Sequence, residues 1–188
     1  YVYAQKALDN GWLGNLTMIR CRLAHNGAVA EKGQTQGWLP TRFFDKEKSG
    51  GGSFIDLGAH PIYLTNRLAG PAQALHANLK STKGLEVDDN AVAMVEYESG
   101  AIGVIETSFL SSGSPFQLEL YGTKGTLLIE DEQIRLKSSQ HGGGAWVLPE
   151  APESLPMPLE QWSMLMKDGT KPTITKDDVI ALTRMNEA

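Results

Sequence analysis

Between residues 73 and 138 the sequence divides into short strand-like runs joined by turns, and this pattern constrains the fold more than any other feature. The turns Glu98-Ser99-Gly100 and Gly122 to Gly125 are typical of hairpins. No helical segment separates consecutive runs, so a repeated strand–helix–strand unit is excluded. The pattern predicts a mostly antiparallel sheet. Its expected strands are residues 73–82, 90–98, 101–109, 116–121, 126–130 and 133–138.

Helical segments flank this series of hairpins. Helices are expected at residues 2–10, after the three glycines that begin at Gly50, at 159–167, and after an N-cap at Thr175. One more strand is expected near the start, at residues 17–25, where apolar side chains alternate with arginines. This arrangement indicates one α+β domain over residues 1–188, an open and mostly antiparallel sheet with helices on one face.

Two of the expected strands are apolar on both faces. In residues 90–98, Val92 and Met94 occupy one face while Ala93 and Val95 occupy the other. A sheet that helices cover on one side should be polar on the other. We therefore expect the second face to form a homo-oligomer interface.

Composition excludes several classes of protein. Hydrophobic residues make up 41% and charged residues 21%, which is typical of soluble globular proteins, and no apolar run is long enough to cross a membrane. Basic residues are scattered and the net charge is -5, so no nucleic-acid surface is expected. Cys21 is the single cysteine, which excludes an internal disulfide and favours the cytoplasm. The chain begins with Tyr1 in the middle of a helical pattern, so we expect a fragment of a longer protein.

Three glycines, Gly50 to Gly52, precede the central helix and have two interpretations. They allow unusual backbone angles in a loop, or they let the backbone approach a ligand while the helix N-terminus faces negative charge. A Walker loop is excluded because no Lys-Ser/Thr pair follows. The dinucleotide fingerprint also fails, because Ile55 stands at the third glycine position. The chain therefore has no nucleotide-binding fold of its own.

Asp56, His60 and Tyr63 follow at helical spacing, with Pro61 directly after the histidine. Proline disfavours helical angles at the preceding residue, so we expect the helix to break around residues 58–61 and His60 to project from the break. A neighbouring carboxylate can orient an imidazole that accepts a proton near neutral pH. An incidental pair is the alternative. No metal site is expected, because the H-E-x-x-H motif is absent.

The stretch KSGGGSFIDLGAHPIYLTNRLAG resembles the motif that opens the catalytic helix of the glucose–fructose oxidoreductase / inositol dehydrogenase (Gfo/Idh/MocA) family. ALDNGWLGNLTMIRCRLAHNG, DDNAVAMVEYESGAIGVIETSF and ELYGTKGTLLI occur in that family's order. The resemblance implies a C-terminal domain for substrate binding and oligomerisation. It also implies that NAD or NADP is bound mainly by a separate N-terminal Rossmann domain, which is not part of this chain.

The same resemblance implies roles for individual residues. Asp56 and His60 would be catalytic, together with a lysine of the nucleotide domain that has no counterpart here. His60 would take a proton from a hydroxyl of a sugar, cyclitol or related polyol while hydride passes to the nicotinamide. Tyr63 stands where many relatives have a carboxylate, which leaves the mechanism intact and the sugar undefined.

Four residues are candidates for substrate contact: His25, Asn26, Trp38 and Tyr63. His25 ends the first strand and is followed by Asn26; its alternative role is a hydrogen-bonded core histidine. Trp38 lies in the long loop 27–49, where it either stacks on a sugar ring or anchors the loop by burial.

The favoured function is one domain of an NAD(P)-dependent oxidoreductase, inactive by itself because it lacks the cofactor site and the lysine. Two other classes remain open. One is a non-catalytic sugar-binding or dimerisation module, and the other is a metal-dependent hydrolase.

Overall fold

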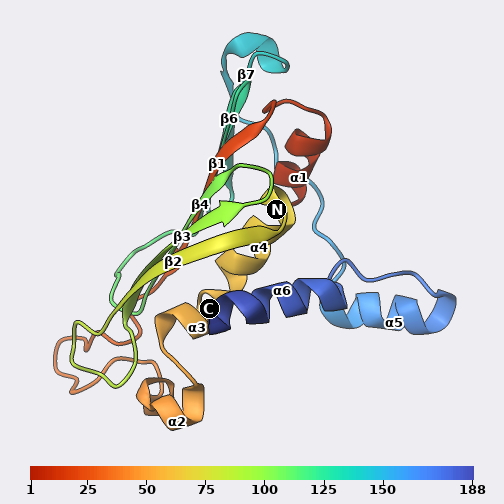
Figure 1. Cartoon of the computed structure of the whole chain (residues 1–188). Helices are drawn as coiled ribbons and strands as arrows, with labels where there is room; N and C mark the ends of the chain where they lie inside the picture. Colours follow the sequence, from red (N-terminus) through yellow and green to blue (C-terminus); the bar gives the residue numbers. More distant parts are fainter.

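The computed structural model describes residues 1–188 and contains one eight-stranded sheet with its helices on one side (Figure 1). The strand order is β2-β3-β4-β1-β5-β6-β7-β8, and every neighbouring pair is antiparallel except β1 and β4. The predicted α+β fold is confirmed. The strands are β1 Leu16–Ala24, β2 Ala72–Lys80, β3 Asn90–Tyr97, β4 Ile102–Ser108, β5 Gln117–Gly122, β6 Gly125–Glu130, β7 Gln133–Ser138 and β8 Trp146–Val147.

The central strand β1 follows the expected alternation. Ile19 and Cys21 are fully buried against the helices, whereas Arg20 and Arg22 lie on the opposite face. Because β1 and β4 are parallel, their carboxyl ends lie at the same edge of the sheet. There the N–H of His25 donates to the carbonyl of Ser108 (2.9 Å).

The helical layer consists of α1 Val2–Asp9, α3 Ser53–Asp56, α4 Ala59–Ala69 and α6 Lys176–Glu187, while α5 Pro158–Asp168 lies away from the sheet (Figure 1). Helix α4 packs against β1, and its Ile62, Thr65 and Leu68 are buried. The guanidinium of Arg67 on α4 donates to Asp178 at the start of α6 (3.0 Å). The C-terminal helix is thereby tied to the helix that carries His60. None of the helices is both long and apolar enough to cross a membrane.

The segment expected to be a long loop contains two short helical turns, η1 Thr41–Phe44 and α2 Lys46–Ser49. Its base is closed by backbone hydrogen bonds from Leu39 N–H to Gly27 O (2.9 Å) and from Ala28 N–H to Phe109 O (3.0 Å). Strand β8 is not among the expected strands, because its two residues are too few to show a period.

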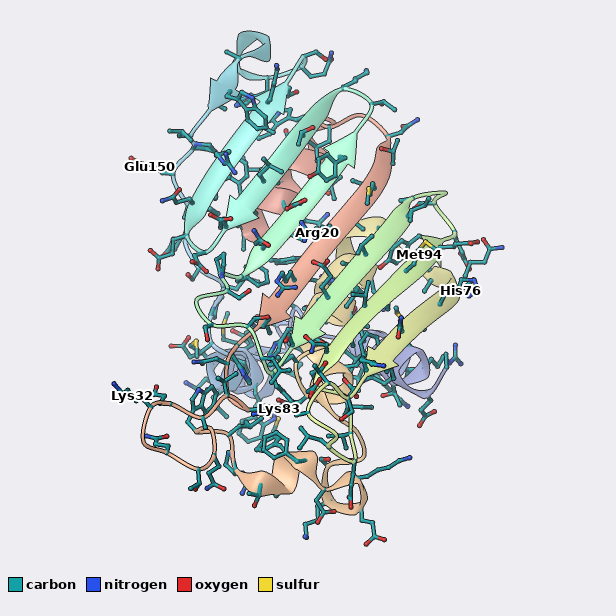
Figure 2. The ribbon with its side chains drawn as sticks, turned by 90° about the vertical axis from the view of Figure 1, so that its left-hand side faces the viewer. Arg20, Lys32, His76, Lys83, Met94 and Glu150 are labelled. Atoms are coloured by element: carbon teal, nitrogen blue, oxygen red, sulfur yellow. The ribbon has the colours of Figure 1, made fainter.

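Figure 2 looks onto the face of the sheet that the helices leave open, with Arg20 at its centre. The guanidinium of Arg20 donates to Glu106 (2.7 Å) and Glu119 (3.1 Å) on the flanking strands. Apolar side chains that are 37–48% exposed surround these ion pairs; they are Met18, Val92, Met94 and Ile102. The predicted apolar character of both faces is confirmed.

Candidate functional site

The three glycines serve the protein's own packing. Gly50 ends α2 in a left-handed conformation (φ 77°), and a Cβ on Gly52 would lie 1.9 Å from the carbonyl oxygen of Asp88. The carboxylate of Asp88 accepts hydrogen bonds from the N–H groups of Gly52 (3.1 Å) and Phe54 (2.9 Å) and from the Ser53 hydroxyl (2.8 Å). This carboxylate therefore caps α3. The interpretation as an unusual loop is correct, and an open anion site at this helix terminus is excluded.

The helix breaks as predicted, but His60 does not lie in the break. Helix α3 ends at Asp56 and α4 begins at Ala59, so Leu57 and Gly58 separate them. His60 lies within α4, contrary to the expectation that Pro61 forces it out of helical angles. Pro61 stands in the first turn, where backbone N–H groups have no partner in the helix, so its missing N–H breaks no hydrogen bond.

His60 is exposed and lies on the wall of a groove of about 240 Å³. Ala59, His60 and Tyr63 of α4 form one side of this groove. The other side comes from the C-terminal segment, through apolar Ile174, Val179 and Leu182 together with Asp178. The imidazole of His60 makes no hydrogen bond within the chain. A ligand in this groove would therefore meet a free imidazole beside a wall that is apolar except for Asp178.

The predicted contact between Asp56 and His60 is not formed in this chain. The carboxylate of Asp56 makes no hydrogen bond, although the residue is half-buried. Its charge instead acts on His25: burial lowers the pKa of His25, and the Asp56 carboxylate opposes that shift. Asp56 thus links two groups of candidate residues. It precedes α4 in the chain, and it lies close enough to influence His25.

His25 lies in an aromatic cluster at the edge where β1 and β4 end. Its ring stacks on Phe109, with centroids 5.3 Å apart and planes at 12°, and Trp38 covers it at 4.7 Å and 52°. Its Nδ1 accepts a hydrogen bond from the N–H of Gly27 (3.0 Å). The histidine is hydrogen-bonded, as its alternative role required, yet it is only half-buried.

Asn26 and Trp38 belong to the same cluster. The indole Nε1–H of Trp38 donates to Oδ1 of Asn26 (3.2 Å), and Trp38 is 58% exposed. Trp38 therefore does not anchor the loop by burial; its neighbour Leu39, 6% exposed, does so. An exposed indole held by a hydrogen bond offers an open apolar surface to a ligand.

Tyr63 lies on α4 beside His60 rather than in the aromatic cluster. Its ring is half-buried, and burial raises the pKa of its hydroxyl. The guanidinium of Arg67 lies 5.9 Å from the centre of the ring. The structure therefore divides the candidates between a groove with His60 and Tyr63 and an aromatic cluster with His25, Asn26 and Trp38.

Sequence analysis missed Asp88, Phe109 and Gly27. Asp88 caps a helix that begins 35 residues earlier, and Phe109 reaches His25 only because β1 pairs with β4. No local sequence pattern predicts either contact. Gly27 could have been recognised from the sequence, since a glycine two residues after a strand-end histidine lets the imidazole approach the backbone closely.

Two observations limit which groups this chain can hold. No three His, Cys, Asp or Glu side chains converge so that they could hold a metal ion. The N-terminus of α3 is occupied by Asp88, so the residues here do not fit a dinucleotide phosphate. The groove beside His60 is open to solvent and brings this imidazole within reach of a bound molecule.

Known proteins resemble this chain in both sequence and fold. A family model described as the GFO/IDH/MocA C-terminal domain matches residues 1–128. An uncharacterised oxidoreductase of Synechocystis sp. is 29% identical over 154 residues, which cover 74% of this chain and 39% of that protein. Bacillus subtilis scyllo-inositol 2-dehydrogenase (NAD(+)) is 25% identical over 194 residues, covering 95% of this chain and 52% of the enzyme.

Solved structures show the same fold at lower identity. Levoglucosan dehydrogenase in complex with NADH and levoglucosan superposes with a TM-score of 0.81 at 17% identity, covering 98% of this chain and 58% of that one. An oxidoreductase domain protein from Kribbella flavida gives 0.77 at 19% identity, with 98% and 58% covered. The chain spans about half the length or less of the curated relatives named above.

Proposed function

Because this chain belongs to the Gfo/Idh/MocA oxidoreductases and matches their C-terminal domain, we propose that it is the substrate-binding and catalytic-histidine domain of an NAD(P)-dependent dehydrogenase. Its substrate is a sugar, cyclitol or related polyol, as the names of the relatives suggest. The cofactor is bound mainly by an N-terminal Rossmann domain outside these residues. The observation that carries the proposal is His60, an exposed imidazole without a hydrogen-bond partner in a largely apolar groove.

In this proposal His60 removes the proton from a substrate hydroxyl. Its imidazole is exposed and has no hydrogen-bond partner within the chain, so a substrate hydroxyl can reach it, and histidine is the residue that most often serves as a general base. Asp56 accepts a hydrogen bond from the substrate, since its carboxylate has no partner in the chain. A bound nicotinamide would supply the hydride acceptor for the carbon that carries this hydroxyl. Trp38 offers its open face to the apolar side of the sugar ring.

We also propose that the open face of the sheet joins copies of the chain. Its exposed apolar side chains surround the ion pairs of Arg20 with Glu106 and Glu119, and this mixture suits a self-complementary contact. A non-catalytic sugar-binding or dimerisation module would use this face equally well. It would not need a free imidazole in a groove. The lone, buried Cys21 fits the cytoplasm.

The proposal is tested by assaying nicotinamide absorbance in the full-length enzyme, meaning this chain joined to its nucleotide-binding domain, against a panel of polyols. We expect reduction of NAD or NADP with at least one polyol, and no turnover by residues 1–188 alone. A full-length enzyme that binds a polyol without oxidising it would favour the non-catalytic module. Turnover by the isolated chain would contradict the need for a second domain.

A further inference from the structure

The ring of half-buried His25 is held from three directions at the end of β1. Phe109 stacks on one side, Trp38 covers the ring, and the N–H of Gly27 donates to Nδ1. Trp38 is itself held by Asn26 (3.2 Å). Rotation of the imidazole would break the hydrogen bond and disturb both aromatic contacts. The ring therefore has one orientation before any ligand arrives.

The hydrogen bond from Gly27 also fixes where the proton lies. An Nδ1 that accepts a hydrogen bond carries a lone pair, so the neutral ring must carry its proton on Nε2. Burial lowers the pKa of His25, which favours the neutral ring at pH 7. His25 is thus a donor through Nε2, and Nε2 makes no hydrogen bond within the chain.

Gly27 is required for this arrangement. A Cβ at position 27 would lie 2.8 Å from Cε1 and 3.0 Å from Nδ1 of His25, and 2.9 Å from the Cβ of Leu39. Any larger residue would push the ring away from the N–H that fixes it. Gly27 therefore has two roles: its N–H donates to the His25 ring, and its lack of a side chain leaves room for that ring.

We propose that His25 is a preset hydrogen-bond donor that selects a ring hydroxyl of the polyol, with the ring's apolar face lying on Trp38. This inference rests on the proposed function and adds to it which chemical group of the substrate His25 binds. The oxygen of this hydroxyl accepts from Nε2–H of His25, and its hydrogen donates to the carboxylate of Asp56. A hydroxyl meets both requirements, whereas an ammonium group cannot accept from His25 and a carbonyl cannot donate to Asp56.

The tautomer can be read directly in the 188-residue chain by long-range ¹H–¹⁵N spectra of its four histidines, assigned by single His→Asn variants. At pH 7 we expect His25 to be neutral with its proton on Nε2. Addition of myo-inositol or levoglucosan should shift the His25 signals, whereas exposed His76 on β2 serves as the unaffected reference.

Each other outcome overturns a defined statement. A proton on Nδ1, or a charged ring, overturns the preset donor whether or not the polyol binds. If a polyol shifts the signals of His60 and leaves those of His25 unchanged, the proposed contact with His25 is wrong, whereas the proposed function stands. If neither polyol shifts any histidine or the Trp38 indole, the inference and the assigned substrate class both fail.

Kinetics of the full-length enzyme supply a second readout. His25→Phe keeps a stacking ring and removes the donor, so KM should rise about tenfold to hundredfold with a smaller change in kcat. His25→Gln, which restores an N–H near the Nε2 position, should recover part of the loss. His76→Phe is the matched control. An unchanged KM in His25→Phe would contradict the inference.

Discussion

Two histidines near Asp56 are treated in opposite ways by the fold. His25 is held by Phe109, Trp38 and the N–H of Gly27, whereas His60 is exposed on α4 with no hydrogen-bond partner. A group that recognises a substrate benefits from one fixed orientation and one fixed tautomer. A group that exchanges a proton must be stable in both protonation states. The contrast supports our proposal that the aromatic cluster recognises the substrate and that His60 in the groove transfers the proton.

The largest expected effect comes from removing the free imidazole. In the full-length enzyme His60→Ala should lower kcat by about a hundredfold to ten-thousandfold, because general-base assistance is lost, while KM changes little. Nicotinamide absorbance measures both constants. His76→Ala is the matched control, since His76 is exposed on β2. Unchanged turnover in His60→Ala would remove the distinction between the two histidines.

The next effect concerns the support of Asp56 and His60. In Gly52→Ala the new Cβ would lie 1.9 Å from the backbone oxygen of Asp88, so the free energy of unfolding should fall by about 3 kcal/mol. Gly50→Ala is the control: it has a positive φ but no atom within 4 Å, and should cost about 1 kcal/mol. Denaturant titration of the chain measures both. Equal losses would mean that close approach to Asp88 is unimportant.

A smaller effect should follow from removing the exposed indole. Trp38→Ala removes the open wall of the aromatic cluster and should weaken polyol binding by about tenfold, with kcat of the full-length enzyme nearly unchanged. Trp146→Ala is matched in type and exposure (50%) but lies on edge strand β8. Titration of the polyol into each variant, followed by fluorescence, measures affinity. If Trp146→Ala weakens binding as much as Trp38→Ala, the assigned site is wrong.

The smallest effect is on the pH dependence of stability. Burial lowers the pKa of His25 in the folded chain, so the unfolded chain binds a proton first as the pH falls below about 6.5. The free energy of unfolding should therefore decrease between pH 7.5 and 5.5. Denaturant titrations should show a shallower decrease in His25→Asn and no change of slope in His76→Asn. A steeper decrease in His25→Asn would contradict the burial argument.

Local patterns predicted the fold better than they predicted the site. The alternation of Val92 and Met94 with Ala93 and Val95 and the turn at Gly100 lie within a few residues of one another, so strands and hairpins could be recognised. The parallel pairing of β1 with β4 joins segments more than 80 residues apart, as the Arg20–Glu106 ion pair shows. That pairing has no local signature.

The same limit explains the errors at the site. Trp38 and Leu39 are neighbouring apolar residues in a loop without periodicity, so the sequence could not tell which one is buried. The rule that disfavours helical angles before proline was applied to His60 without allowing for the first turn of a new helix. The cap that Asp88 provides for α3 comes from a residue 35 positions after the start of that helix, so no local pattern could predict it.

Because β1 pairs with β4 in a parallel ladder, the number of residues in β1 decides which side chain stands at the site. Side chains alternate between faces along β1, so inserting one residue within it would turn His25 away from Phe109 and present a different side chain to the ligand. The same insertion among exposed residues 30–36 would only lengthen a surface loop. Length variation among homologues should therefore be tolerated in that loop and be rare within the central strand.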